Sequence, residues 1–445
     1  MPRVGDVFQL LSGTLAVPNT TIASSPYNAQ QNDWVTEANS PRPVSAGGTG
    51  ETTAEGARTE LGAIGVGDLA DADTKAVVVE TDSVVIIDSE DANTNKRWLV
   101  SDLDTHMLTL NPPVAATRNR LVNGAFQISQ EYAGTPATDT GAYPADQWKI
   151  TRTVTTGIVS AIWVPATNTN PHRLRLAATT DQATIGSGVW FLSQTMEGNR
   201  TPDFRWGTST GVPAVLRLRV QASQAGTYGF FIRNTPRTHT YVGTFTISSA
   251  SPSEVGVRVE KIIAIPAPPD DSVWTVNTGA GMEVGFTMAC AAGGLAATPG
   301  WKTTAVYGVT GQTNLMATLN AEVVFNAVSL YFDPGGTGAP PKWEIPDETE
   351  ELRACQRYWF KMTPISPNGR RVCTTATNIM DAGSIAYPVD PRVTPAITHL
   401  TEPTYENCSG GVWSAGSMDA CLRVNTTAAG VYRASGGTYA FNMRI

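Results

Sequence analysis

Residues 216–220, Leu-Arg-Leu-Arg-Val, decide the fold class, and residues 172–176, His-Arg-Leu-Arg-Leu, have the same pattern. In both stretches every second side chain is aliphatic. This period of two is typical of a β-strand with one face on a core and the other in water. Over residues 121–333, helical periodicity is nearly absent, and short strands alternate with turns rich in Gly, Pro, Asn and Thr. The pattern predicts a mainly β protein with a central sandwich or jelly roll.

The composition agrees with a β protein of several domains. At roughly 150 residues per domain, the 445 residues correspond to about three domains. Hydrophobic residues make up 41% of the chain, so it can bury real cores, and 41 Gly with 29 Pro favour turns over long helices. The net charge of −8 argues against a nucleic-acid partner.

The start of the chain and the cysteines bear on its location. The opening stretch lacks the basic start, long apolar run and cleavage site of a signal peptide. No window reaches the run of about 18 apolar residues that predicts a membrane span, so we expect no membrane insertion. The five cysteines are odd in number and widely spaced, which is not the pattern of a disulfide-dense secreted scaffold. We expect synthesis in a cytoplasm.

A helix with a narrow apolar seam is predicted after residue 24. Ser25 and Pro26 are a typical helix start, and Pro41 ends the pattern. The seam suits contact between helices, although one helix lying on its own domain is the alternative. Its residues are Tyr27, Gln31, Trp34, Val35 and Ala38.

Residues 43–65, PVSAGGTGETTAEGARTELGAIG, carry the most specific motif of the chain. Thr52 with Glu55 fits a capping box, and Gly62 is a natural helix stop. The stretch resembles the GGTG-x-TTA-x-GAR-x-x-LG repeat of bacteriophage tail fibres. In that family the segment belongs to a trimeric shaft near the virion-attachment end. The resemblance implies a homotrimer and predicts that residues 1–66 attach the chain to other tail or baseplate proteins.

Residues 67–115 are interpreted as a small β spacer. Ala76–Val79 and Val84–Ile87 predict short strands, and residues 68–104 carry ten acidic and three basic side chains. The acidic spacing fits no calcium loop, so a solvated surface is expected and no metal is predicted.

The central region, residues 121–345, carries two further resemblances. Residues 121–130, LVNGAFQISQ, and 140–150, TGAYPADQWKI, resemble the NGA-x-Q-x-SQ…YP-x-D-x-W module of phage tail proteins. Residues 189–198, 216–233 and 326–335 are similar to jelly-roll carbohydrate-binding modules. Some of those modules hold calcium through an early acidic residue, but Gln127 occupies that place here, so the resemblance implies no metal.

Glycan binding needs exposed aromatic rings that stack on sugars, with polar side chains nearby. Trp206, beside Arg205 in a polar turn, and Trp301, after Pro299-Gly300, are the candidates in the central region because loops concentrate recognition residues. Trp413, in a glycine-rich stretch, is a third candidate tryptophan. A buried packing role is the alternative for Trp206 and Trp301, whereas Trp148 and Trp190 are expected in the core.

The C-terminal region, residues 346–445, predicts a small α+β tip. Asp347 and Glu350 form a capping pattern, and apolar spacing predicts a helix over residues 348–361. Residues 351–361, ELRACQRYWFK, resemble the EL-x-x-CQRYY element that opens the C-terminal domains of phage tail fibres. Residues 387–400 resemble the strand that follows it, with Pro391-Arg392 in place of Met-Arg. Cys355 is expected to be a buried small residue rather than a nucleophile.

The sequence shows no recognised catalytic arrangement, so no catalytic residue, cofactor or enzyme activity is predicted. The resemblances together imply an elongated fibre protein in a virion tail, assembled in a host cytoplasm. Its expected function is noncovalent, multivalent adhesion to a bacterial surface polysaccharide. Two alternatives remain: a structural tail component without receptor binding, and a tailspike enzyme that degrades polysaccharide with two facing carboxylates.

Overall fold

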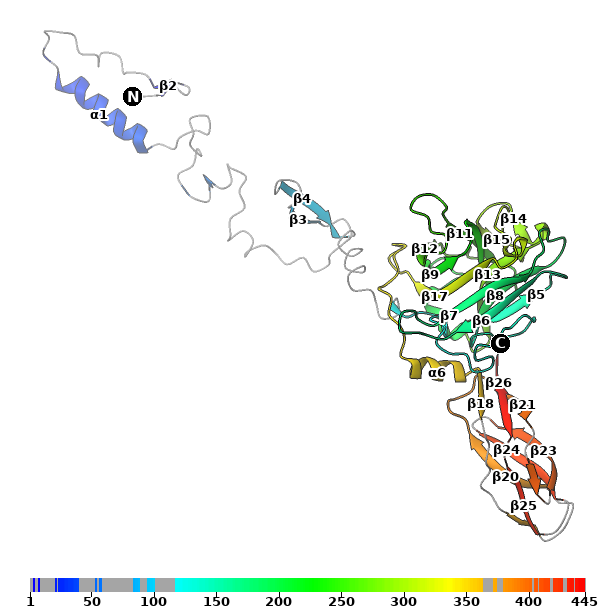
Figure 1. Cartoon of the computed structure of the whole chain (residues 1–445). Helices are drawn as coiled ribbons and strands as arrows, with labels where there is room; N and C mark the ends of the chain where they lie inside the picture. Colours follow the sequence, from blue (N-terminus) through cyan, green and yellow to red (C-terminus); the bar gives the residue numbers. More distant parts are fainter. Residues whose placement is uncertain are drawn as a thin grey trace. The chain divides into compact units, whose positions relative to one another are not determined.

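The computed structural model forms two compact units, residues 1–100 and 101–445, and each is described by itself (Figure 1). The structure describes residues 3–4, 7–8, 21, 23–39, 53, 56–57, 83–88, 94–100, 117–362, 371–373, 379–401, 404–406, 408–416, 419–426, 430–435 and 437–444. No helix in these ranges is long and apolar enough to cross a membrane.

Among its described residues, the first unit contains two short strand pairs and one helix of 16 residues. Strands β1 (Arg3–Val4) and β2 (Val7–Phe8) pair antiparallel, and β3 (Ser83–Asp88) forms a second hairpin with β4 (Thr94–Leu99). Helix α1 (Ser24–Asn39) confirms the helix predicted before Pro41. The predicted strand at 76–79 and the capping pair Thr52 and Glu55 lie outside the described residues. Within that motif, the Thr53 hydroxyl accepts a hydrogen bond from the Gly56 amide at 3.0 Å.

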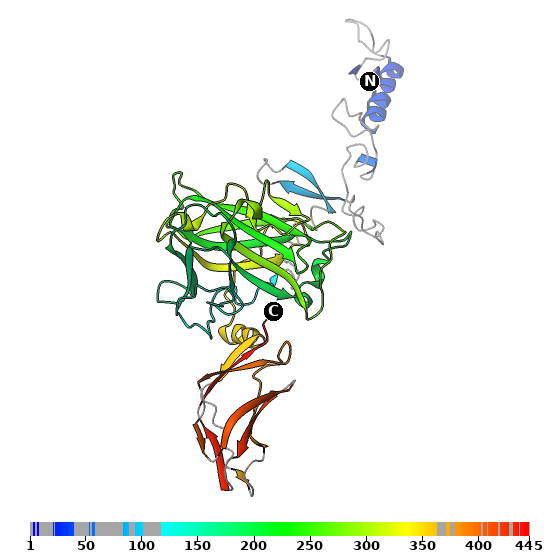
Figure 2. The ribbon, with the colours of Figure 1, turned by 90° about the vertical axis from the view of Figure 1, so that its right-hand side faces the viewer.

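Two antiparallel sheets form the central sandwich and confirm the predicted mainly β fold (Figures 1 and 2). The six-stranded sheet has the order β15 (Gly300–Lys302), β11 (Thr240–Ile247), β10 (Gly226–Asn234), β13 (Ala280–Cys290), β8 (Val189–Glu197), β5 (Lys149–Arg152). The five-stranded sheet has the order β12 (Val259–Ile265), β9 (Ala214–Ala222), β17 (Glu322–Phe332), β7 (Arg173–Thr180), β6 (Ile158–Val164). A small parallel pair, β14 (Leu295–Ala296) with β16 (Gly308–Val309), accompanies them.

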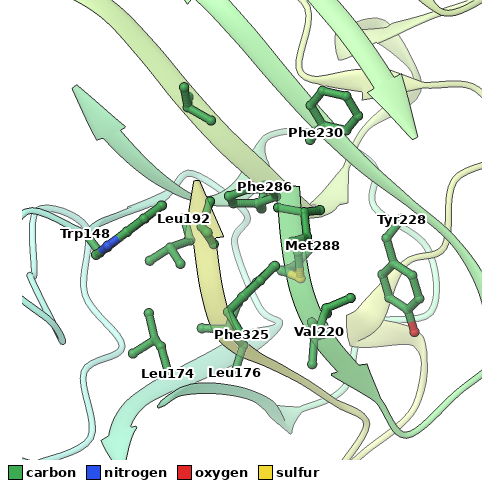
Figure 3. Close-up of a cluster of buried hydrophobic side chains, with 14 of the residues drawn as sticks. Trp148, Leu174, Leu176, Leu192, Val220, Tyr228, Phe230, Phe286, Met288 and Phe325 are labelled. Atoms are coloured by element: carbon green, nitrogen blue, oxygen red, sulfur yellow. The ribbon is translucent and has the colours of Figure 1, made fainter. Parts of the chain in front are cut away.

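The core lies between the two sheets (Figure 3). Phe286 of β13 and Phe325 of β17 meet across it, with ring centroids 4.8 Å apart. Leu216 and Leu218 of β9 are fully buried, as their alternation predicts. Trp148 and Trp190 are also fully buried, which confirms their expected core role.

Two strand faces differ from the prediction. Arg217 of β9 does not face water, because its guanidinium donates to the Pro341 carbonyl at 2.8 Å and pairs with Glu260. Residues 339–347, the connecting segment that follows the sandwich, therefore cover part of the outer face of the five-stranded sheet. The apolar run Ile262-Ile263-Ala264-Ile265 in the sequence predicts a buried strand, but β12 is an edge strand and Ile262 is exposed.

The NGA…W motif folds into one buried hydrogen-bonded turn. Asn123 adopts a positive φ of 53°, and its side-chain amide donates to the carbonyls of Ile128 and Asp146 at 2.7 and 3.0 Å. The Trp148 indole donates to the Asn123 carbonyl at 3.0 Å. The buried Asp146 carboxylate accepts from the Gln130 backbone amide at 2.9 Å, and burial raises its pKa. These bonds hold Asn123, Gln130, Asp146 and Trp148 of the motif in one turn.

Helix α6 (Glu348–Gln356) begins as predicted but ends earlier. The Asp347 carboxylate caps it by accepting from the backbone amides of Thr349 and Glu350 at 2.9 and 3.1 Å. The predicted extension to residue 361 is wrong, because Trp359–Met362 form strand β18 and pair with β26 (Thr438–Asn442). Cys355 is fully buried, as expected, and burial raises the pKa of its thiol.

In the part of the C-terminal region that the structure describes after α6, the strands form small antiparallel sheets, in orange and red in Figure 2. Each has three strands. Their orders are β18-β26-β21 (Ala396–Thr401); β19 (Arg371–Cys373)-β25 (Gly430–Ser435)-β22 (Thr404–Glu406); and β20 (Ile379–Ala386)-β24 (Asp419–Thr426)-β23 (Cys408–Ala415).

Polar contacts join helix α6 to the sandwich. Arg357, just after the helix, pairs with Glu197 at the end of β8, with Nε–Oε1 and Nη2–Oε2 distances of 2.8 and 3.0 Å. Glu351 within the helix accepts a hydrogen bond from the Asn123 amide at 2.5 Å. The opening motif of the sandwich and the opening element of the C-terminal region are therefore in direct contact.

Candidate functional site

Two of the predicted tryptophans meet in one aromatic cluster. Trp206 and Trp301 lie edge to face with ring centroids 5.6 Å apart, and Trp274 contacts both at 4.8 and 6.0 Å. Phe204 stacks on Trp206, and Tyr241 contacts the edge of Trp301. We call Trp206, Trp274 and Trp301 the tryptophan cluster.

All three indole N–H groups of the tryptophan cluster are satisfied within the protein. They donate to the Val212 carbonyl, the Ser272 hydroxyl and the Pro266 carbonyl at 2.7, 2.9 and 2.9 Å. Trp206 is only 6% exposed, whereas Trp274 and Trp301 are partly exposed. The tryptophan cluster therefore presents an apolar surface, and its three indole N–H groups donate to the protein itself rather than to a ligand.

The other two predicted site residues lie in different surroundings. Arg205 is exposed next to Trp206 and has a left-handed backbone with φ 48°. Trp413 lies in the C-terminal sheets, where its half-buried ring contacts Tyr439 and Phe441 edge to face at 5.0 and 6.1 Å. The structure therefore brings Trp206, Arg205 and Trp301 together, with Trp413 in a separate cluster.

A small cavity on the outer face of the five-stranded sheet is the stronger candidate. Its volume is about 170 Å³, close to that of cavities that accept one six-membered ring. We call it the ring cavity. Strands β9 and β17, the β6–β7 connection and the segment 339–347 all contribute to its wall. The lining residues are Ala125, Gln127, Ala166, Pro171, His172, Arg219, Arg258, Asn326, Ala327, Trp343 and Ile345.

The wall of the ring cavity contains side-chain amide groups that lack hydrogen-bond partners among the described residues. Asn326 is 4% exposed, and neither its amide nitrogen nor its amide oxygen has a hydrogen-bond partner among the described residues. The Gln127 side-chain nitrogen donates to the Pro346 carbonyl at 3.1 Å, but its buried oxygen has no partner in that part of the chain. Leaving such groups unpaired costs about 1–3 kcal/mol each, so hydroxyl groups that pair with them would bind favourably.

A β-bulge places Asn326 in this wall. The pairing of β17 with β9 shifts between Phe325 and Ala327, and the extra residue of the bulge is Asn326. On either side of the bulge, Phe325 and Val328 both remain in the core. The bulge therefore adds an amide to the wall of the ring cavity, while Phe325 and Val328 keep their places in the core.

Trp343 supplies the aromatic side of the ring cavity. The guanidinium carbons of Arg217 and Arg219 lie 6.0 and 5.7 Å from its ring centroid, within the range of cation–π contacts. Arg217 and Arg219 also share Glu260 as an ionic partner. The indole is thus held against the sheet by two guanidinium groups, whose charges the single Glu260 carboxylate offsets in part.

His172 and Arg258 also line the ring cavity. The His172 ring stacks on Trp163 at 5.4 Å, and its Nδ1 accepts from the Ala166 amide at 3.1 Å, which leaves Nε2–H as the donor of the neutral ring. Arg258 donates to the Asn170 side chain at 2.8 Å. Amides, an imidazole, guanidinium groups and an indole are the side chains that recognise sugar hydroxyls and ring faces.

Sequence reasoning missed the ring cavity. Trp343 lies in the proline-rich connection PPKWEIP, where a surface aromatic was a usable signal. Asn326 interrupts the apolar run of β17, which was a second signal. No carboxylate belongs to the lining described for this cavity, and the described residues contain no cluster suited to a metal ion.

Comparisons with known proteins place carbohydrate-binding modules among the similar folds. No protein-family model matches the sequence, and no curated protein matches it. A CBM4 module is similar over 47% of this chain and 98% of its own, with 10% identity and a TM-score of 0.25. A family 11 carbohydrate-binding module from Clostridium thermocellum, in complex with a β-1,3-1,4-mixed-linked tetrasaccharide, covers 44% and 95%, with 12% identity and a TM-score of 0.23. The enzymatically active domain of tailspike protein 4 from bacteriophage CBA120 covers 48% and 21%, with 11% identity and a TM-score of 0.24.

Proposed function

We propose that this protein binds a glycan noncovalently and that the ring cavity holds one sugar ring. The observation that carries the proposal is the buried Asn326 amide, which lacks internal partners in a ring-sized cavity beside Trp343. A pyranose offers hydroxyl groups for the amides of Asn326 and Gln127 and an apolar face for the indole.

We further propose that the protein is a tail fibre or receptor-binding protein of a bacteriophage and that its ligand is a bacterial surface polysaccharide. The tail-fibre motifs in the sequence support this role. Helix α1 also leaves Tyr27 and Trp34 exposed on its apolar seam, 54% and 46%, as a helix that packs against copies of itself would. A homotrimer would then present three ring cavities at once.

Binding without cleavage is the proposed chemistry. A glycosidase positions two carboxylates about 5–10 Å apart around the bond it breaks. The described wall of the ring cavity has amides, guanidinium groups and rings instead. This donor set favours recognition of hydroxyl groups over proton transfer to a glycosidic oxygen.

The test is retention of the purified chain on a panel of bacterial cells, together with release of reducing ends from their surface polysaccharide. Trp343→Ala is expected to lower retention about tenfold or more, and Trp343→Phe should retain part of it because a ring remains. Leu319→Ala, which removes an exposed apolar side chain elsewhere on the sandwich, is the control and should change nothing.

Other outcomes would replace the proposal. A loss with Trp301→Ala but not with Trp343→Ala would move the site to the tryptophan cluster. Release of reducing ends would favour a tailspike enzyme. Retention on no cell type and no release would favour a structural tail component.

A further inference from the structure

A second cavity, distinct from the ring cavity, lies where the sandwich meets the end of helix α6. Its volume is about 500 Å³, within the usual range for small-molecule sites. We call it the arginine cavity. Its wall is formed by Arg118, Arg120, Glu197, Asn199, Arg200, Pro202, Asp203, Arg357 and Tyr358.

The arginine cavity carries more positive than negative charge. Four arginines and two carboxylates line it. Arg357 pairs with Glu197 through two bonds, and Arg120 pairs with Asp203. These two ion pairs use both carboxylates, so the charges of Arg118 and Arg200 remain.

Neither of those two arginines forms an ion pair among the described residues. Arg200 donates through Nε to the Arg120 carbonyl at 2.9 Å, and Arg120 donates through Nη1 to the Arg200 carbonyl at 3.0 Å. This exchange fixes Arg200 within the wall, while Arg118 is exposed beside it. Burial lowers the pKa of Arg200, and the Arg118 charge lowers it further, while Tyr358 and the carboxylates of Glu351 and Glu197 offset part of this effect.

We propose that the arginine cavity binds an oxyanion, a carboxylate or phosphate group carried by a small molecule. Planar guanidinium groups bind both kinds of oxyanion through paired hydrogen bonds, and an anion would relieve the repulsion between Arg118 and Arg200. The volume leaves room for the molecule that bears the charge. This inference does not depend on sugar binding in the ring cavity.

Titration of the intact protein at constant ionic strength tests the proposal, with inorganic phosphate, D-glucuronate and neutral D-glucose as probes. At least one oxyanion is expected to raise the unfolding temperature in a saturable way, because a ligand that binds only the folded state stabilises it. Phosphate alone would identify a phosphate-bearing ligand, and glucuronate alone a carboxylate-bearing one. D-glucose should have no effect that depends on the arginine cavity.

Arginine variants test whether the rise in unfolding temperature comes from binding in the arginine cavity. Arg118→Gln changes an exposed side chain and should weaken oxyanion binding about tenfold or more, as should Arg200→Gln. Arg353→Gln, an exposed arginine of helix α6 outside the cavity wall, makes the same charge change and should leave binding unchanged. The proposal is overturned if neither oxyanion gives a saturable shift, if Arg118→Gln has no effect, or if Arg353→Gln weakens binding equally. Trp343→Ala should leave oxyanion binding intact, so failure of the ring cavity would be seen separately.

Discussion

Asn326 is a buried polar side chain whose amide atoms have no hydrogen-bond partner among the described residues. An amide in this position destabilises the folded state relative to an apolar side chain of similar shape. An asparagine at this position has a physical role if its amide forms hydrogen bonds with a ligand. Stability and ligand binding should therefore respond in opposite directions when Asn326 is replaced.

Asn326→Leu is expected to raise the free energy of unfolding by about 1 kcal/mol while weakening glycan binding about tenfold. Urea unfolding and binding to the polysaccharide retained in the cell assay measure the two effects. Thr240→Val is the control, because the Thr240 hydroxyl is also buried without a partner among the described residues but lies outside the ring cavity wall. It should change stability alone. Unchanged binding in Asn326→Leu would exclude the amide from recognition.

Glu197 makes stability depend on pH. Burial raises the pKa of its carboxyl group, but hydrogen bonds from Arg357 and Tyr358 outweigh burial and hold the pKa below its usual range. As the pH falls, the unfolded chain takes up this proton first, near the ordinary pKa of about 4.3. The contribution of Glu197 to stability is complete above that value and is lost as the pH falls through the lower folded pKa.

Glu197→Gln should therefore lower the free energy of unfolding at pH 7 by about 2 kcal/mol, below the range for a fully buried pair because Arg357 is about one-third exposed. The deficit should shrink as the pH is lowered toward 3 in urea unfolding experiments. Glu348→Gln, an exposed glutamate in the first turn of α6, is the control and should not show this trend. A deficit independent of pH would contradict the assignment.

At the level of elements, the alternation of side chains was enough to predict the sandwich strands but not what covers them. Leu216 and Leu218 face the core as their period of two requires. The same period predicts that the Arg217 side chain faces water. In the structure, residues 339–347 lie over the sheet and bury Arg217. The helix predicted to residue 361 ends at Gln356 because Trp359 and the residues after it pair with a strand more than seventy residues later. Such long-range packing overrides local periodicity.

The tryptophan cluster and the ring cavity show the same limit for sites. Trp206 and Trp301 were predicted as loop aromatics, and they meet, but Trp274 completes the tryptophan cluster and Trp206 is buried. The ring cavity forms only because a bulge in β17 and a connecting segment lie together in the folded protein. No local sequence motif predicts that the residues of the tryptophan cluster, or those of the ring cavity, lie next to one another.

Gly124 of the NGA motif allows the first segment of the sandwich to lie against β17. The Val328 amide donates to the Gly124 carbonyl at 2.8 Å, and a Cβ on Gly124 would come within 2.3 Å of the Val328 carbonyl oxygen. Gly124→Ala should lower the free energy of unfolding by about 1–3 kcal/mol because backbone atoms must move apart. Gly186→Ala, where a Cβ would meet nothing within 4 Å, is the control in the same urea experiment. Equal stability of the two variants would show that the β17 contact is not tight.

At the level of the whole molecule, the proposed trimer predicts a large gain from simultaneous binding. Three linked ring cavities should bind a polysaccharide-coated surface ~10²–10⁴ times more tightly than one cavity binds a soluble oligosaccharide of the same sugar. Surface plasmon resonance and calorimetry supply the two affinities, and sedimentation equilibrium gives the oligomeric state. A monomer in solution, or equal affinities in the two formats, would contradict multivalent adhesion.

The segment that carries Trp343 is both a connection and a wall. In a hybrid that carries a different C-terminal region, the position of the junction matters. A junction before residue 339 would replace residues 339–347, and with them Trp343 of the ring cavity, together with the C-terminal region. A junction after Asp347 would keep the native ring cavity. Hybrids that differ only in those nine residues should therefore differ in what they recognise, even with identical tips.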